Sequence, residues 1–349
     1  MKYCVILPSN IKSGPNNVAL DIIKGIKKID SQIEVTVLYF NEYIENKLDF
    51  PTGVKNVNIS LFKSYDLEQF DIIHSHMLKP DFFVFLNKIR NKINSSKTVS
   101  TIHQKDYHNL SSDFGSRTKA FFVSILWRMI LRSQDKIICL SKSMVEFYSW
   151  TLPKHKTSYI YNGRSLSDNV KVTEKFINLK KVIIGSSCYL TSRKGLEQVI
   201  KAIKYRNDIE LHIAGNGPER ENLENLSVRE GVSNRVKFLG HSNNIEDFLN
   251  SIDIYILPSR AEGFPLSLLE AASLGKACIS SRIDIVEEAF SDLELSKFQL
   301  DNQQDLLIAI DRAILKRQSY SEKIKKKHTA EFTPQRMVDN YLSLFKSML

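Results

Sequence analysis

The segment RAEGFPLSLLE, residues 260–270, carries two carboxylates, Glu262 and Glu270, eight positions apart. The apolar run before it, residues 253–257, is typical of a buried parallel strand, and a Pro-Ser pair ends this run. Proline is favoured in the first turn of a helix, so we expect a helix to begin near Pro265. The segment therefore predicts a strand, a tight loop and a helix, with one acid before the helix and the other inside it.

This arrangement predicts an anion site, because backbone N–H groups and the positive end of a helix dipole meet where the helix begins. Glu262 would lie at the mouth of the site. Glu270, one to two turns into the helix, would accept hydrogen bonds from two neighbouring ribose hydroxyls. Together these features indicate a nucleotide-sugar site. The alternative is that both acids are solvated surface residues flanking an ordinary helix.

The two glutamates, followed by the small-residue run AASLGK at 271–276, resemble the hallmark of the retaining glycosyltransferases of family 4, which have the GT-B fold. The resemblance implies an α/β protein with two doubly wound, Rossmann-like domains that face each other across a cleft. It also implies that Glu262 and its neighbours hold the sugar of a nucleotide-sugar donor. These donor-binding neighbours are Gly263, Phe264, Pro265 and Leu266.

Apolar strand patterns alternate with helical patterns along the whole chain, which independently predicts parallel sheets covered by helices on both faces. In the first half we expect strands at 2–7, 33–40, 71–75, 97–102, 136–140 and 157–161, and helices at 17–28, 80–93 and 142–150. In the second half we expect strands at 182–186, 210–214, 235–239, 253–257 and 277–281.

A chain of 349 residues is too long for one ordinary core, so we expect two domains. The first, residues 1–165, would bind the acceptor, and the second, residues 181–334, would bind the donor. Residues 166–180 are mostly polar and charged, which suits a linker. The stretch 335–349 has apolar residues on one helical face, and in the family this terminal helix packs back on the first domain.

Arg193 and Lys194 lie in a loop that follows the strand at 182–186 and opens a helix. The resemblance assigns Lys194 to the donor pyrophosphate, where its charge would stabilise the departing phosphate. The family usually has an arginine five or six residues earlier, but Tyr189 and Cys188 occupy those positions here. We expect Arg193 to replace it. A surface Arg-Lys pair at a helix start is the alternative.

Two further donor-side residues follow from the resemblance. Gly217 belongs to the turn AGNGP at 214–218, which resembles the family's Gly-Asp/Asn-Gly-Pro turn. His241 follows the strand at 235–239, where family members hold the nucleotide base. Glycines at such turns often only supply a positive φ, and His241 is equally interpretable as a half-exposed loop residue.

In the first domain the resemblance points to Gly14 and His103. Gly14 follows the first strand, where a family glycine lets the backbone approach the donor phosphate or the acceptor; the usual glycine pair is reduced to one here. His103 ends a strand, as does the family's catalytic-centre histidine, which contacts the donor sugar. His74 and His76 end another strand, and we interpret them as packing or loop residues.

Metal chemistry has no sequence support: there is no Asp-x-Asp motif and no His, Cys and carboxylate cluster with metal-ligand spacing. We therefore expect no metal and no cofactor, with Lys194, Arg193 and helix N-termini meeting the phosphate charge. In the family, retention of configuration is attributed to same-face attack through an oxocarbenium-like state. A covalent role for Glu262 is the alternative.

The formal net charge of +10 allows nucleic acid, an anionic membrane or an acidic substrate as a partner. No nucleic-acid recognition pattern is present, so we expect no nucleic acid. The apolar stretch 120–131 is too short to span a bilayer and is flanked by basic residues, which fits either an interfacial helix or a buried core helix. The first residues lack the charged start and cleavage site of a signal peptide. We expect a cytoplasmic protein bound peripherally to the inner face of the cytoplasmic membrane.

The resemblance thus implies a hexosyltransferase that uses a nucleotide sugar, in this family most commonly a UDP-sugar. The basic, apolar-rich first domain favours a lipid-linked saccharide acceptor in bacterial surface-polysaccharide assembly, such as lipopolysaccharide with its O-antigen. Two alternatives have the same architecture: a sugar-nucleotide epimerase and a catalytically inactive GT-B partner subunit.

Overall fold

The computed structural model describes residues 1–63, 65–105, 116–166, 181–242 and 244–349. The chain forms two compact units. Unit 1 consists of Met1–Gly163 and Pro334–Leu349, and unit 2 consists of Arg164–Thr333. Nearly all of the expected linker, 166–180, lies outside the described residues.

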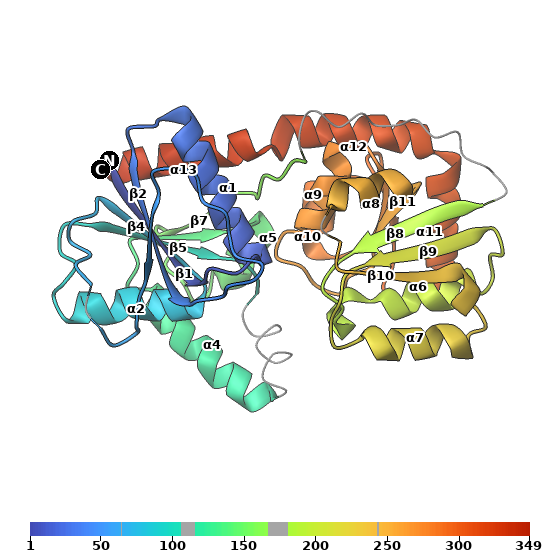
Figure 1. The fold of residues 1–349 in the computed structure, drawn as a ribbon, viewed down its shortest axis with the longest axis horizontal. Coiled ribbons are helices and arrows are strands. Elements are labelled where there is room, and N and C mark those ends of the chain that lie inside the picture. The colour runs from blue at the N-terminus through green and yellow to red at the C-terminus, as the bar shows by residue number, and fades with distance from the viewer. Residues whose placement is uncertain (64, 106–115, 167–180, 243) are drawn as a thin grey trace. The chain divides into compact units, whose positions relative to one another are not determined.

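Unit 1 is built on a seven-stranded parallel sheet with the strand order β3-β2-β1-β4-β5-β6-β7. Figure 1 shows α1 and α13 on one side of this sheet and α2 and α4 on the other. The strands are β1 (Lys2–Ser9), β2 (Glu34–Asn41), β3 (Lys55–Asn58), β4 (Ile72–His76), β5 (Lys97–Ile102), β6 (Lys136–Cys139) and β7 (Thr157–Tyr159). The helices are α1 (Gly14–Ile29), α2 (Leu78–Ile89), α4 (Arg117–Leu131), α5 (Lys142–Tyr148) and α13 (Pro334–Met348).

The terminal helix α13 packs against α1 and closes one face of this sheet. Its buried side chains reach the polar centre of the unit: the Phe345 ring lies 5.1 Å from the Tyr3 ring, and the Tyr341 hydroxyl lies 3.0 Å from Thr101 Oγ1. Unit 1 is therefore completed by residues that follow unit 2 in the sequence.

Unit 2 is built on a six-stranded parallel sheet with the order β10-β9-β8-β11-β12-β13. Helices α6 and α7 lie on one side of it and α8 and α9 on the other (Figure 1). The strands are β8 (Val182–Ser187), β9 (Ile209–Ala214), β10 (Val236–Gly240), β11 (Ile254–Leu257), β12 (Ala277–Ser281) and β13 (Ser296–Phe298). The helices are α6 (Leu196–Ile203), α7 (Arg220–Arg229), α8 (Ile245–Ser251), α9 (Leu266–Ser273), α10 (Asp284–Ala289), α11 (Gln303–Leu315) and α12 (Arg317–Glu331), with short 3-10 turns at Ser192–Lys194 and Ser233–Arg235.

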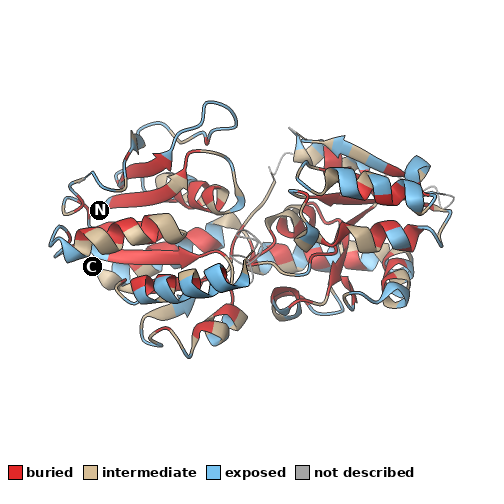
Figure 2. Ribbon diagram, turned by 90° about the horizontal axis from the view of Figure 1, so that it is seen from below, coloured by how far each residue is buried: buried red, intermediate tan, exposed pale blue. Residues whose placement is uncertain are grey.

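The expected fold class, two doubly wound parallel sheets, is confirmed. Central strands are buried on both faces, as Figure 2 shows, and this explains their continuous apolar runs. The sequence patterns missed β3 and β13, which are short edge strands with the sequences KNVN and SKF. The expected helix start near Pro265 is also confirmed, because Pro265 is the N-cap of α9.

Each sheet has a topological switch point, where the chain order reverses between β1 and β4 in unit 1 and between β8 and β11 in unit 2. In doubly wound sheets, ligands bind outside the carboxyl ends of the strands at this point. Gly14 follows β1, Lys194 follows β8 and Glu262 follows β11, so each lies just after a switch-point strand. His103 follows β5, the neighbour of β4.

Candidate active site

A buried ion pair lies at the switch point of unit 2. Lys194 Nζ donates a hydrogen bond of 2.6 Å to Glu262 Oε1, and the two side chains are only 15% and 9% exposed. Ser259 Oγ donates to the same oxygen at 2.7 Å. Arg193 Nη1 lies 3.7 Å from Glu262 Oε2. Two loops separated by 68 residues are thus joined by one carboxylate.

Backbone contacts hold these loops together. The Arg260 N–H donates to the Arg193 carbonyl at 2.8 Å, and Arg193 Nη1 donates to the Ala261 carbonyl at 3.0 Å. Gly195 has a φ of +65°, and a Cβ there would lie 2.1 Å from the Pro258 carbonyl oxygen. Only glycine therefore fits this close approach of the two loops.

Charge decides the protonation of Glu262. Burial by itself would raise its pKa, but the Lys194 and Arg193 charges and the hydrogen bonds from Lys194 and Ser259 outweigh burial and lower the pKa. Glu262 is therefore an anion at neutral pH, able to accept hydrogen bonds and unable to serve as a general acid. Lys194 keeps two N–H groups beyond the one donated to Glu262.

Glu270 lies on α9, where its Oε1 accepts a 2.9 Å hydrogen bond from Arg164 Nε. Its side chain is 13% exposed. Arg164 was not predicted from the sequence; it lies 106 residues earlier, and no local pattern marks the pair. A ribose at Glu270 would therefore meet a carboxylate already oriented by a guanidinium.

The residues between the two glutamates are mainly a scaffold. Gly263, Phe264 and Pro265 are buried, and Leu266 is half-buried at the start of α9. The Phe264 ring packs against Phe332, with 5.6 Å between ring centres. Packing of the Phe264 ring therefore anchors the loop between the two glutamates.

Gly217 and His241 lie at neighbouring strand ends. Positive φ at the turn belongs to Gly215, at 136°, rather than to Gly217. Gly217 is needed for close packing, because a Cβ there would lie 2.3 Å from the Leu190 carbonyl oxygen. His241 is exposed in the loop after β10.

In unit 1, Gly14 is the first residue of α1, and a Cβ added to it would meet no atom within 4 Å. The loop before it is fixed by the buried Asn16, whose Nδ2 donates to the Ser9 and Ile11 carbonyls at 3.1 and 2.8 Å. The sequence analysis did not identify Asn16. Space beside Gly14 is compatible with close approach of a ligand to the backbone.

His103 belongs to a buried cluster of imidazoles and hydroxyls. Its Nε2 lies 2.8 Å from His76 Nδ1, and the two rings meet edge to edge with centres 5.1 Å apart and planes inclined by 29°. His74 bridges Tyr3 and Thr101 through hydrogen bonds of 2.7 Å from its two ring nitrogens. Burial lowers the pKa of His74 and of His103 to about 3, and the pKa of His76 is lowered in the same way. All three are neutral at physiological pH.

The expectation that His74 and His76 are only packing or loop residues did not anticipate this cluster. A signal was present, because residues two apart in a strand share one face of the sheet. In the neighbouring strand β5, Thr101 is the register partner of His76. His103 follows Thr101 by two residues and therefore lies beside His76.

Helix α4 contains the apolar stretch 120–131, and it presents two faces. Ala120, Trp127, Ile130 and Leu131 are buried, and Trp127 Nε1 donates to the buried Asp81 at 2.7 Å. The other face exposes Phe121, Phe122, Ile125, Leu126 and Met129. In the described part of the chain, no helix is long and apolar enough to cross a membrane.

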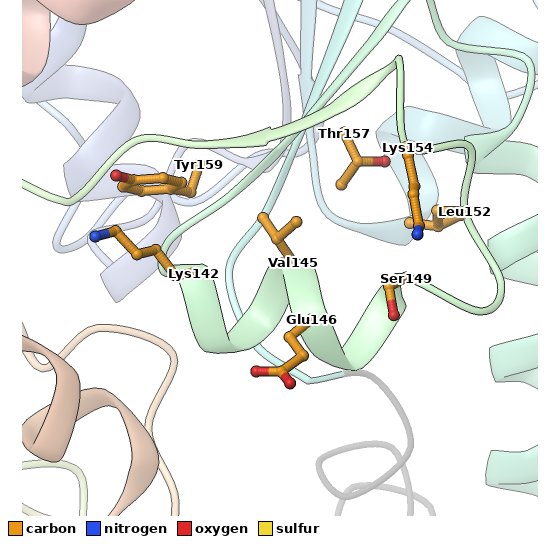
Figure 3. A pocket seen from close by; sticks show the side chains of 8 residues that line it. All are labelled: Lys142, Val145, Glu146, Ser149, Leu152, Lys154, Thr157 and Tyr159. Atoms are coloured by element: carbon orange, nitrogen blue, oxygen red, sulfur yellow. The ribbon is translucent and has the colours of Figure 1, made fainter.

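A separate cavity of about 350 Å³ lies between α5 and β7 in unit 1. Figure 3 shows Val145 in its middle, Lys142 and Tyr159 toward one side, and Lys154 and Leu152 toward the other. It contains none of the predicted site residues. Among the described residues, no cluster of three or more His, Cys, Asp and Glu side chains has the arrangement of a metal site.

Comparison with known proteins identifies the family. Residues 18–168 match the family described as Glycosyltransferase Family 4, and residues 169–330 match Glycosyl transferases group 1. The O-antigen biosynthesis glycosyltransferase WclY of Escherichia coli is 32% identical over 360 aligned positions, which cover 100% of this chain and 99% of WclY.

A more distant relative and a solved structure are also similar to this chain. The UDP-Gal:alpha-D-GlcNAc-diphosphoundecaprenol alpha-1,3-galactosyltransferase of E. coli is 26% identical over 74% of this chain and 73% of its own length. The structure of Anabaena HepE in complex with UDP and glucose superposes with a TM-score of 0.77 at 17% identity, covering 99% of this chain and 100% of HepE. The chain is therefore a glycosyltransferase and belongs to glycosyltransferase family 4, with the GT-B fold.

Proposed function

We propose that this glycosyltransferase transfers a hexose from a UDP-sugar, with retention of configuration, to a lipid-linked saccharide during assembly of a bacterial lipopolysaccharide or O-antigen. The observation that carries the proposal is the buried Lys194–Glu262 pair at the switch point of unit 2. The ammonium of this pair suits the negatively charged diphosphate of a nucleotide sugar, and the carboxylate can accept hydrogen bonds from the sugar hydroxyls.

Lys194 would bind the donor pyrophosphate. An ammonium with two N–H groups left can donate to phosphate oxygens while its third N–H stays on Glu262. The low exposure of the site strengthens the attraction to the charge that develops as the nucleoside diphosphate leaves. Arg193, 3.7 Å from the same carboxylate, would add a second positive charge without any metal ion.

Glu262 would hold hydroxyls of the donor sugar as an acceptor. Its Oε1 already accepts from Lys194 and Ser259, and these hydrogen bonds reduce its strength as a nucleophile. We therefore favour same-face attack by the acceptor through an oxocarbenium-like state over a covalent glycosyl-enzyme. Glu270, oriented by Arg164, would accept from the ribose hydroxyls. In unit 1, His103 would contact the donor sugar, and Gly14 would let the backbone approach a phosphate or the acceptor.

The relatives support the choice of substrates. WclY is named for O-antigen biosynthesis, and the more distant galactosyltransferase is named for a UDP-sugar donor and a diphosphoundecaprenol-linked acceptor. We extend the UDP donor and the lipid-linked acceptor to this chain.

A lipid-linked acceptor requires contact with a membrane surface, and the exposed face of α4 suits this. Five large apolar side chains on that face are between 41% and 65% exposed, and the helix contains no acidic residue. The basic residues Arg117 and Lys119 lie in the first turn of this helix, and Arg132 is its C-cap. Apolar side chains seated among headgroups, with cations nearby for anionic lipid, are what an interfacial helix requires.

The chemistry is tested by incubating the purified protein with UDP-, GDP- and ADP-sugars and following slow hydrolysis and transfer by NMR. We expect UDP release and a sugar product with the anomeric configuration of the donor. An inverted product would overturn retention, and release from only GDP- or ADP-sugars would overturn the UDP assignment. An isomerised nucleotide sugar would indicate an epimerase, and no turnover with any donor would indicate an inactive subunit.

The membrane contact is tested by co-sedimentation with vesicles. We expect binding to anionic vesicles and not to neutral ones, and weaker binding as salt rises because the attraction is screened. Replacing Phe122 and Leu126 by Ser should abolish binding, whereas Leu315→Ser, at an even more exposed apolar site in unit 2, should not. Equal binding to both vesicle types, or none at low salt, would leave a soluble acceptor.

A further inference from the structure

We propose that His76 is a positioning residue that fixes the tautomer of His103, so that His103 presents its Nδ1–H as a hydrogen-bond donor to a ligand oxygen. The inference rests on the proposed contact between His103 and the donor sugar. Its test has a readout that does not depend on catalysis.

A single hydrogen bond joins the rings of His76 and His103. His76 is the last residue of β4, and His103 follows the adjacent parallel strand β5. His76 Nδ1 and His103 Nε2 are 2.8 Å apart, which is a hydrogen bond between two imidazoles. Since both rings are neutral, one of these nitrogens carries the proton and the other accepts it.

Burial of the far side of His76 decides between the two arrangements. His76 is fully buried, and within the described residues its Nε2 has no hydrogen-bond partner. If His103 donated to His76, then His76 would carry its own proton on Nε2, as a buried N–H without an acceptor. Among backbone groups, buried N–H donors without an acceptor are rarer than buried acceptors without a donor, and we apply the same preference to the imidazole nitrogens. The proton therefore lies on His76 Nδ1, which donates to His103 Nε2.

The tautomer of His103 follows. With Nε2 accepting from His76, the proton of His103 must lie on Nδ1, and no group in the described part of the chain hydrogen-bonds to this nitrogen. Imidazole in water slightly favours the Nε2–H form, so the surroundings must impose the Nδ1–H form on both rings. His103 would then donate to a sugar hydroxyl or a phosphate oxygen, and would not accept a proton from the acceptor.

The direct test is ¹⁵N NMR of histidine-labelled protein without substrate. Only eight histidines are present, so the His103 and His76 signals are assignable from single substitutions. We expect both rings to show a protonated Nδ1 and an unprotonated Nε2. A protonated Nε2 on His103 would overturn the inference, whatever the protein's activity.

Two variants of similar shape separate the hydrogen bond from packing. His76→Asn retains an N–H near the position of Nδ1 and should keep the His103 tautomer and kcat within about threefold of wild type. His76→Asp can only accept there, so it should move the His103 proton to Nε2 and lower kcat by at least about tenfold with little change in KM. Equal kcat in the two variants would overturn the role of His76.

Controls keep the outcomes distinct. His155→Asn, at an exposed histidine of the same unit, should change neither the tautomer nor kcat. Fluorescence of the buried Trp127 checks that each variant is folded. If His103→Ala retains full activity, the proposed contact of His103 with the donor fails, while the NMR result still decides the tautomer.

Discussion

The switch-point region of each unit has a buried polar cluster, and the two clusters differ in charge. In unit 2 the cluster is an anion held by two cations, Glu262 with Lys194 and Arg193. In unit 1 it consists of neutral imidazoles and hydroxyls around His76 and His103. Burial disfavours charge in both places, but only unit 2 supplies opposite charges that outweigh it. The strand order thus determines where each polar cluster lies, and the neighbouring side chains determine whether the cluster is charged.

The two units should differ most in the pH at which they unfold. The pKa of His74 and of His103 is about 3 in the folded protein, below the ordinary 6.5, so the unfolded chain binds protons that the folded chain does not. Their stabilisation of unit 1 is present above pH 6.5 and is lost as pH falls towards 3, at about 1.4 kcal/mol for each pKa unit. Asp81, with a pKa raised to about 6, acts in the opposite direction over a smaller range.

The contribution of Glu262, whose pKa is lowered, begins to be lost only below its ordinary value of 4.5. The pKa values of His212 and His328 are also lowered, by less than those of the unit 1 histidines. Acidification therefore also destabilises unit 2, but to a smaller extent. We therefore expect unit 1 to unfold at a higher pH than unit 2. Both tryptophans, Trp127 and Trp150, lie in unit 1, so their fluorescence reports on that unit, and hydrogen exchange of β8 and β11 reports on unit 2. Simultaneous loss of both signals would contradict the comparison.

The next largest effect concerns the charged cluster. Lys194→Ala and Glu262→Ala should each reduce kcat by at least a hundredfold, since each removes transition-state stabilisation of roughly 3 kcal/mol. Steady-state transfer assays measure this loss. Lys204→Ala, which breaks the exposed pair with Glu230 in the same unit, is the matched control and should keep wild-type kcat. Near-normal turnover in either active-site variant would remove that residue from the mechanism.

A smaller effect is expected at the proposed ribose contact. Glu270→Ala should weaken UDP binding by about 1.5 to 3 kcal/mol, the range for a lost hydrogen bond to a charged group. Calorimetry of UDP binding gives the number. Because Arg164 orients this carboxylate, Arg164→Ala should reproduce part of the loss, and the double variant should lose less than the sum. Unchanged UDP affinity in Glu270→Ala would exclude the ribose assignment.

No effect is expected from chelation. If Lys194 and Arg193 supply the positive charge at the phosphates, transfer rates with and without EDTA should be equal. Loss of activity in EDTA, with rescue by Mg²⁺ or Mn²⁺, would show that the charged cluster is incomplete without a metal ion.

Much of the fold was predictable because doubly buried parallel strands leave continuous apolar runs, such as residues 3–7 and 254–257. The edge strand β3 was not, since three of its four residues are exposed and its sequence is polar. The faces of α4 were also beyond the pattern. The buried face includes Trp127, which donates a hydrogen bond to Asp81, 46 residues earlier in the chain.

The sequence could indicate which candidate residues follow the ends of strands, but it could not indicate their contacts. Lys194 and Glu262 each follow a recognisable strand, yet nothing local indicates that they share a hydrogen bond. The partner of Glu270, Arg164, lies before the expected linker rather than near α9. Long-range pairing of this kind is set by the strand order of the sheet, which local periodicity does not encode.

Because helix α13 belongs to unit 1, this unit cannot be completed until the last residues of the chain have been synthesised. Thr101 and Tyr341, which are in hydrogen-bond contact, are 240 positions apart, so the ribosome must make all of unit 2 before unit 1 can close. Until then the nascent chain exposes Tyr3 and the sheet face that Phe345 later covers. Although domains generally fold from the N-terminus during translation, here the domain that begins first is finished last.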